Sequence, residues 1–167
     1  MEFILAQYKD YEAVAQLHNN SEIYGQSLTL DAEASKERFE ELCAIWQTRL
    51  TNPPFNQHVI LVSQQEQLVG LICLFANHDF ERGGLIDALY VDERLQHQGI
   101  GRELVKRAAI WQKQHFDRNG VYLKISSAYK AALKFYQELG ADIDSSDEEQ
   151  IIVSWDSVDE LCGHIAS

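Results

Sequence analysis

Apolar residues recur every three or four positions in several stretches of the chain, which is the spacing of one helix face. The longest such stretch runs from Asp31 to Thr51 and stops at Asn52-Pro53-Pro54, because proline cannot continue a helix. Its apolar stripe consists of Phe39, Leu42, Cys43, Trp46 and Leu50. A shorter helix is predicted after Asp10, a residue type that caps helix N-termini, with the stripe Tyr11, Val14, Leu17 and His18.

Other stretches are short apolar runs, which predict strands. The expected strands are Glu2 to Tyr8, His58 to Ser63, Leu68 to Phe75, Leu85 to Val91, Val121 to Ile125 and Gln150 to Trp155. The polar turn Gln64-Gln65-Glu66-Gln67 joins the second and third as a hairpin. Asn19 to Leu30 is expected to be an irregular polar loop, and the residues after Trp155 a short acidic tail. This order predicts an α/β (mixed α+β) fold, a central mixed sheet flanked by helices, with residues 1–167 as a single domain.

The stretch from Leu85 to Phe116 combines a strand, a glycine turn and a helix. The helix carries the apolar stripe Ile100, Leu104, Ala108 and Trp111. Gly99 and Gly101 lie where the strand turns into this helix, so free backbone N–H groups and the positive end of the helix dipole point outward together. Such a turn suits a phosphate or pyrophosphate.

The glycine spacing excludes two familiar phosphate loops, because neither G-x-x-x-x-G-K-[ST] nor G-x-G-x-x-G occurs here. What remains is Gln96-x-x-Gly99-x-Gly101, which resembles motif A of the GNAT superfamily of N-acetyltransferases. In that family the motif binds the pyrophosphate of acetyl-CoA. The same glycines also fit a tight turn with close helix packing.

A second segment resembles GNAT motif B, whose pattern is Asn-x-x-Ala-x-x-x-Tyr followed by Gly-Phe. Ala132, Tyr136 and Gly140 match it, while Tyr129 holds the position of the usual Asn and Ala141 that of Phe. Gly140 also fits the left-handed position that ends a helix. The two motifs together imply a GNAT-type acyl-CoA N-acyltransferase fold along nearly the whole chain.

The resemblance implies an N-acetyltransferase that uses acetyl-CoA as its acyl-donor cosubstrate. The residues it assigns to acetyl-CoA are Leu89, Tyr90 and Val91 at the strand end, Gln96, His97, Gln98, Gly99, Ile100 and Gly101 in the turn, and Arg102 and Tyr129. Arg102 is a cation at a helix N-terminus, where the dipole disfavours it, and a bound anion would resolve that conflict.

Two residues are the candidates for catalysis. By resemblance, Tyr136 is the general acid that protonates the leaving thiolate, and Asp87 is the base that deprotonates the amine through a water. Strand alternation would place Asp87 on one face with Leu85, Leu89 and Val91. The alternatives are that Tyr136 is a core tyrosine and that Asp87 pairs with an arginine.

The expected acceptor is the primary amine of a small cationic molecule. In the family the loop between the first two helices builds this pocket, and Glu22 and Tyr24 in it would suit a cation. Two alternatives stay open. One is a protein lysine or N-terminal acetyltransferase, and the other is a non-catalytic sensor that binds acyl-CoA.

The formal net charge of −12 argues against nucleic acid and anionic membranes as partners. The chain lacks an apolar run long enough for a membrane span and a signal peptide at its N-terminus, so the expected location is the cytoplasm. Cys43, Cys73 and Cys162 are scattered in apolar surroundings, and no histidines pair at ligand spacing, so neither disulfides nor a metal is expected. Many family members pair through sheet edges, so the resemblance makes a homodimer plausible.

Overall fold

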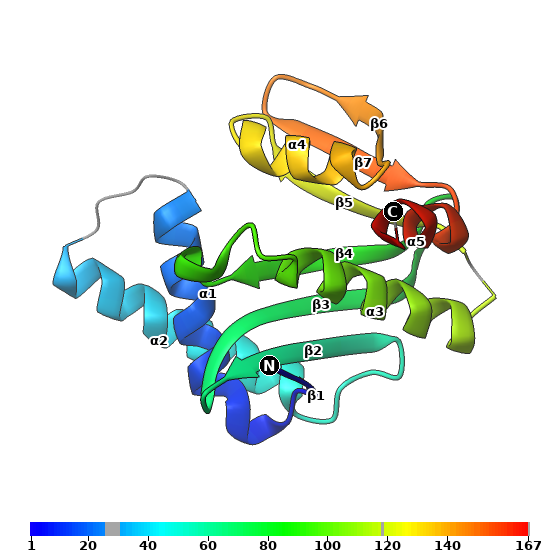
Figure 1. Cartoon of the computed structure of the whole chain (residues 1–167). Helices are drawn as coiled ribbons and strands as arrows, with labels where there is room; N and C mark the ends of the chain where they lie inside the picture. The colour runs from blue at the N-terminus through cyan, green and yellow to red at the C-terminus, as the bar shows by residue number, and fades with distance from the viewer. Residues whose placement is uncertain (26–30, 118, 167) are drawn as a thin grey trace.

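The computed structural model describes residues 1–25, 31–117 and 119–166, and its centre is one mixed sheet of seven strands in the order β1-β2-β3-β4-β5-β7-β6 (Figure 1). The strands are β1 Glu2–Leu5, β2 Gln57–Gln64, β3 Gln67–Asp79, β4 Gly83–Val91, β5 Val121–Ser126, β6 Asp142–Ser146 and β7 Gln150–Trp155. Neighbouring strands are antiparallel except for the parallel pair β4 and β5. The predicted mixed α/β fold is therefore confirmed.

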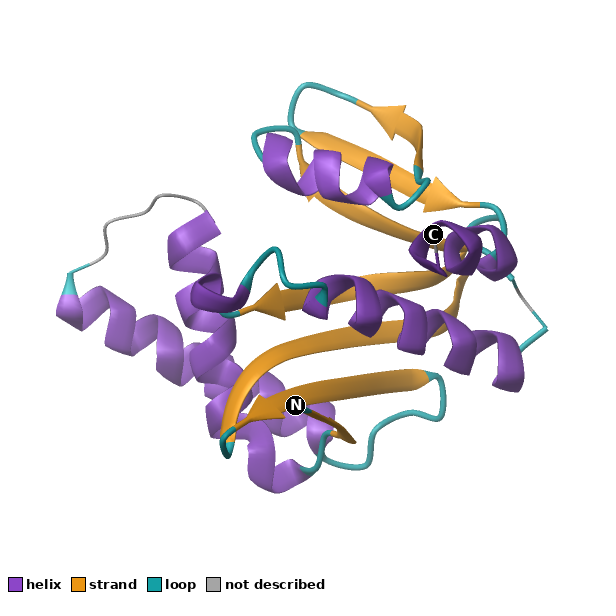
Figure 2. Ribbon diagram, in the orientation of Figure 1, coloured by secondary structure: helices purple, strands orange, loops and turns teal. Residues whose placement is uncertain are grey.

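Helices cover both faces of the sheet (Figure 2). The helices are α1 Tyr11–Gly25, α2 Ala32–Leu50, α3 Ile100–His115, α4 Lys130–Glu138 and α5 Val158–Ala166. The core on one face is shared by α1, α2 and strands β2 to β4, with Val14, Leu42 and Trp46 fully buried. The core on the other face brings α3, α4 and α5 together, with Leu104 and Leu161 fully buried. We call these the α2 face and the α3 face.

The longest predicted helix is confirmed as α2, and the structure shows which residue starts it. The Asp31 side chain accepts a hydrogen bond from the backbone N–H of Ala34, as an N-cap should. Trp46 and Leu50 of its predicted stripe are buried. The predicted hairpin is also confirmed, because β2 and β3 pair around a turn in which Gln65 and Glu66 adopt positive φ.

Four expected boundaries were wrong. Residues 19–25, predicted to be loop, continue α1, whereas residues 26–30 lie outside the described residues. The expected acidic tail contains α5, which packs on the α3 face through Val158 and Leu161. Strand β6 was missed because four of its five residues are polar and all five are exposed, and it pairs only with β7 among the described strands. The first strand ends at Leu5 rather than Tyr8.

The sheet opens between β4 and β5. These strands pair only through Gly84 with Val121 and Leu85 with Tyr122 among the described residues. Beyond that point β4 stays paired with β3 up to Val91, while β5 follows β7 (Figure 1). The outer half of β4 therefore presents its backbone toward the opening without a strand partner from β5.

Candidate active site

Two residues in the turn between β4 and α3 have a left-handed backbone. His97 and Gly99 both have positive φ, 65° and 85°, while Gln96 between strand and turn has a φ of −65°. Such alternation turns successive N–H groups toward one side. None of the backbone N–H groups of residues 97–101 donates to another described residue. A Cβ added to Gly99 would meet nothing within 4 Å, so the space above the turn is open to a ligand.

Gly101 has a different role from Gly99. A Cβ on Gly101 would lie 3.3 Å from Cζ of Phe135 in α4 and 3.9 Å from Val91. The close-packing interpretation therefore fits Gly101, whereas the ligand interpretation fits Gly99. Gln96 folds back toward the strand, since its Nε2 lies 3.3 Å from the Val91 carbonyl oxygen and donates to it.

Three arginines lie near this turn, and two of them form ion pairs with neighbouring carboxylates. Arg94 forms a bidentate pair with Asp92, with nitrogen–oxygen distances of 3.0 and 2.7 Å. Arg107 pairs with Glu103 at 2.9 Å. Arg102 is exposed in the first turn of α3, directly beside the open N–H groups.

A bulge in β4 changes the predicted alternation of side chains. Cys73 of β3 faces Ala88, but the next residue, Leu74, faces Ile86, so Asp87 is an extra residue between them. As a result Leu89 and Val91 pack on the α3 face, whereas Asp87 reaches α2. The prediction that Asp87 shares a face with Leu89 and Val91 was wrong, because the bulge shifts the alternation by one residue.

Asp87 forms an ion pair with Arg49 at the end of α2. Asp87 Oδ2 lies 2.8 Å from Arg49 Nη1, and the two side chains are 30% and 28% exposed. The Arg49 guanidinium stacks over the Trp46 ring, 4.9 Å from its centroid. The alternative that Asp87 pairs with an arginine is therefore confirmed, and the arginine is Arg49.

A chain of aromatic side chains continues from Trp46. Its indole Nε1–H donates to His18 Nδ1 at 3.1 Å, and His18 Nε2 lies 2.8 Å from the Tyr90 hydroxyl. Because an indole can only donate, His18 is the tautomer with its proton on Nε2, and it donates to Tyr90. The Tyr90 side chain thus belongs to the α2 face. Only the backbone of Tyr90 is available to hydrogen-bond a ligand in the opening between β4 and β5. Sequence reasoning missed this chain, since His18 and Trp46 read only as core positions.

Tyr136 lies in α4 and is 7% exposed. Its ring packs against Phe135 and Trp155, with centroid distances of 5.1 and 6.0 Å. Burial raises the pKa of the Tyr136 phenol above its usual range, so the hydroxyl keeps its proton. That hydroxyl makes no hydrogen bond to another described residue. Tyr129 is half-buried immediately before α4, and its side chain makes no capping bond.

The structure brings the predicted residues together in part. The turn of residues 96–101 contacts α4, next to Tyr136, through Gly101 and Phe135. Asp87 lies across the sheet on the α2 face. Glu22 and Tyr24 belong to the last turns of α1, and their side chains lie outside the described residues.

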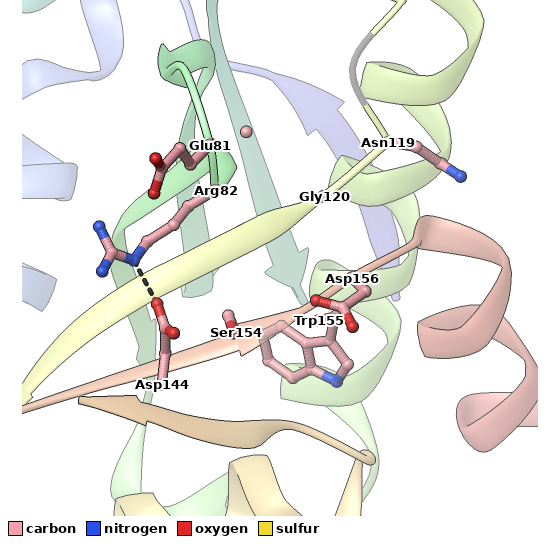
Figure 3. A pocket seen from close by; sticks show the side chains of 9 residues that line it. Glu81, Arg82, Asn119, Gly120, Asp144, Ser154, Trp155 and Asp156 are labelled. Atoms are coloured by element: carbon pink, nitrogen blue, oxygen red, sulfur yellow. Dashed lines mark hydrogen bonds and ion pairs between the residues drawn. The ribbon is translucent and has the colours of Figure 1, made fainter.

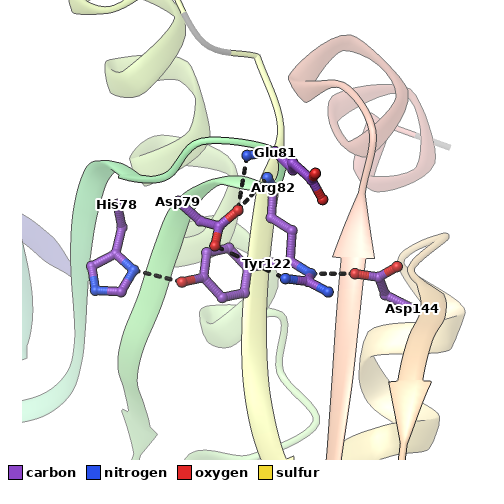
Figure 4. A network of polar contacts seen from close by, with 6 residues as sticks. All are labelled: His78, Asp79, Glu81, Arg82, Tyr122 and Asp144. Carbon is purple, nitrogen blue, oxygen red and sulfur yellow. Dashed lines mark hydrogen bonds and ion pairs between the residues drawn. The ribbon is translucent and has the colours of Figure 1, made fainter.

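A separate cavity of about 350 Å³ lies at the closed end of β4 and β5, away from the glycine turn (Figure 3). Its wall includes Arg82, which pairs with Asp144 of β6. Beside it Tyr122 bonds His78 Nδ1 at 2.5 Å (Figure 4). These contacts join the β3–β4 hairpin to β5 and β6, so we assign this end of the sheet a structural role.

The described residues include no group of side chains that could hold a metal ion, and no helix among them is long and apolar enough to span a membrane.

The sheet opens beside the glycine turn, and the buried Tyr136 lies nearby in α4. The chain belongs to the GNAT acetyltransferase family, whose sequence profile matches residues 15–141. The predicted family membership is therefore confirmed.

Individual proteins are similar over nearly the full chain. L-amino acid N-acetyltransferase AaaT of Escherichia coli (strain K12) is 23% identical over 159 residues, covering 92% of this chain and 90% of that protein. The crystal structure of PaiA N-acetyltransferase from Thermoplasma acidophilum, in complex with coenzyme A, superposes with a TM-score of 0.75 at 15% identity, covering 93% and 99% of the two chains. A variant of spermidine N-acetyltransferase SpeG from Vibrio cholerae gives 0.67 at 16% identity, covering 96% and 97%. At these identities the two solved structures support the fold alone.

Proposed function

We propose that this protein transfers the acetyl group of acetyl-CoA to the primary amine of a small molecule. The observation that carries the proposal is the open turn of residues 97–101, whose N–H groups lack partners among the described residues, beside a gap in the sheet. Such a turn stabilises a bound pyrophosphate. The β4 backbone beyond Leu85 has no β5 partner and could pair with an extended chain.

The donor would be held by backbone more than by side chains. The turn would bind the pyrophosphate through the N–H groups of residues 97–101, with Arg102 adding a positive charge. The strand end Leu89 to Val91 would hydrogen-bond the pantetheine arm, because its backbone faces the opening. Tyr129 would flank that arm from the start of α4.

In the reaction the amine nitrogen attacks the thioester carbon, so a C–N bond forms and the C–S bond breaks. The departing CoA thiolate would take a proton from the Tyr136 hydroxyl, which stays protonated because burial raises its pKa. The attacking amine must lose a proton, and we propose that Asp87 receives it through a water. Asp87 lies on the α2 face, so in this scheme the acceptor approaches from that face and the donor from the other.

A small-molecule acceptor agrees with the names of two similar proteins, one an L-amino acid N-acetyltransferase and the other a spermidine N-acetyltransferase. The test is release of the CoA thiol from acetyl-CoA on a panel of polyamines, amino acids, aminoglycosides and short peptides, with mass spectrometry of the product. Thiol release with an acetylated small amine is expected. Transfer only to peptides would point to a protein acceptor, and acetyl-CoA binding without any transfer would point to a sensor. Failure to bind acetyl-CoA would contradict the assignment of the turn.

A further inference from the structure

The ion pair between Arg49 and Asp87 lies where an acceptor would meet the donor. Asp87 is the bulged residue of β4, two positions past Leu85, the last residue of β4 that pairs with β5. The ion pair therefore lies on the α2 face, close to the point along β4 where its pairing with β5 ends. Each side chain keeps nearly a third of its surface accessible, so a small molecule can reach both charges.

Both partners retain bonding capacity. The ion pair between them joins Nη1 of Arg49 to Oδ2 of Asp87 at 2.8 Å. No other described side chain bonds the Arg49 guanidinium or the Asp87 carboxylate. A guanidinium has five N–H donors and a carboxylate has about four acceptor sites, so donors and acceptors are left over side by side.

The guanidinium is held in place before any ligand arrives. It rests on the Trp46 ring, and Trp46 is fully buried and hydrogen-bonded to His18. The Arg49 backbone carbonyl also accepts a hydrogen bond from Gln57 Nε2 at 2.9 Å. Preorganised charges of this kind bind a ligand with less loss of side-chain entropy.

We infer that the Arg49–Asp87 pair is a receptor for a zwitterionic acceptor, a free α-amino acid, and this inference rests on the proposed function. The ammonium group of the acceptor would lie against Asp87 and its carboxylate against Arg49. A multiply charged polyamine would meet the Arg49 cation instead, which disfavours it. The same contact would orient the acceptor nitrogen toward the gap between β4 and β5, where the thioester would lie.

The experiment compares each L-amino acid with its own α-amide, which keeps the amine and the side chain but lacks the carboxylate. For the wild-type enzyme we expect a KM about tenfold or more lower for the amino acid, the magnitude of a charge-assisted hydrogen bond. This comparison needs no variant. Equal KM values for the two members of the pairs would overturn the inference.

Arg49→Gln then tests the residue. We expect it to raise the KM for the amino acid by about 10- to 100-fold while leaving the KM values for the α-amide and for acetyl-CoA unchanged. Arg107→Gln is the matched control, because Arg107 also pairs with a carboxylate, at 2.9 Å, and stacks over a ring, that of Phe3, at 4.0 Å. An equal loss with amino acid and amide would indicate a structural role for Arg49 and overturn the inference.

The experiments distinguish a wrong acceptor site from a wrong enzymatic activity. If amides or polyamines are acetylated and amino acids are not, the acetyltransferase function stands and the zwitterion receptor is refuted. If acetyl-CoA binds but no amine is acetylated, the proposed function fails and the receptor with it.

Discussion

Gly101 and Phe135 are in such close contact that α3 and α4 are joined at the glycine turn, with only 3.3 Å between Phe135 Cζ and the position of a Cβ on Gly101. Gly99, two residues earlier, has open space in the corresponding direction. One glycine thus fixes the turn against α4, next to Tyr136, and the other leaves room for a ligand.

Replacing Gly99 by alanine should affect both stability and ligand binding. Its φ of 85° is left-handed, so we expect Gly99→Ala to lower the free energy of unfolding by about 1 kcal/mol. The new methyl group would point into the proposed phosphate site and weaken acetyl-CoA binding. Urea denaturation and calorimetric titration measure the two effects. Gly101→Ala is the control, because its methyl group would lie against Phe135 and Val91 and not in the open space above the turn, and it should retain most of the affinity.

Removing the charge of Arg102 should weaken the donor complex. Because Arg102 is exposed and its interaction is screened by water, we expect Arg102→Ala to raise the Kd for CoA by about three- to tenfold at low salt. The difference should shrink as salt is added. Lys113→Ala, at the far end of the same helix, should leave the Kd unchanged. An unchanged Kd for Arg102→Ala at low salt would remove Arg102 from the site.

Tyr136→Phe tests the general acid. We expect kcat to fall by about 100-fold or more with little change in the KM for acetyl-CoA, the scale of general acid catalysis. Burial raises the pKa of Tyr136, so the kcat of the wild-type enzyme should not fall below about pH 10 through loss of the Tyr136 proton. Tyr122→Phe is the control, because its hydroxyl bonds His78 at the closed end of the sheet. Equal turnover of Tyr136→Phe and wild type would leave Tyr136 as a core residue.

His58 should make the fold sensitive to acid. Its ring stacks on Trp111 at 4.1 Å, and burial, followed by the nearby His115, lowers its pKa from 6.5 to about 4. The unfolded chain therefore binds a proton between pH 6.5 and 4 that the folded protein does not, and stability falls as the pH falls through this window. We expect urea denaturation of His58→Phe to show a shallower loss of stability over that range. Parallel curves for the two proteins would show that His58 is not responsible.

The elements fixed by local periodicity were predictable. The stripe of α2 and the left-handed Gly140 after α4 each depend on neighbours within one or two helical turns, and the structure confirms them. The turn from Gln96 to Gly101 was also visible, because glycine spacing after a buried strand is a local property. The helical structure of residues 19–25 and the strand β6 were not predictable from the sequence. Their mostly polar residues carry no periodic signal, and their structure depends on packing or on strand pairing.

The arrangement of the catalytic candidates was decided by tertiary structure. A single bulged residue moves Asp87 away from Leu89 and Val91 and into contact with Arg49, which is 38 positions earlier in the chain. Sequence alternation assumes an unbroken strand, and it cannot show a bulge that depends on the register with β3. The local sequence was therefore enough to identify the family and to predict the glycine turn between β4 and α3. The placement of Asp87 beside Arg49 on the α2 face depends on the pairing of β3 with β4 and on the packing of α2, which join segments far apart in the chain.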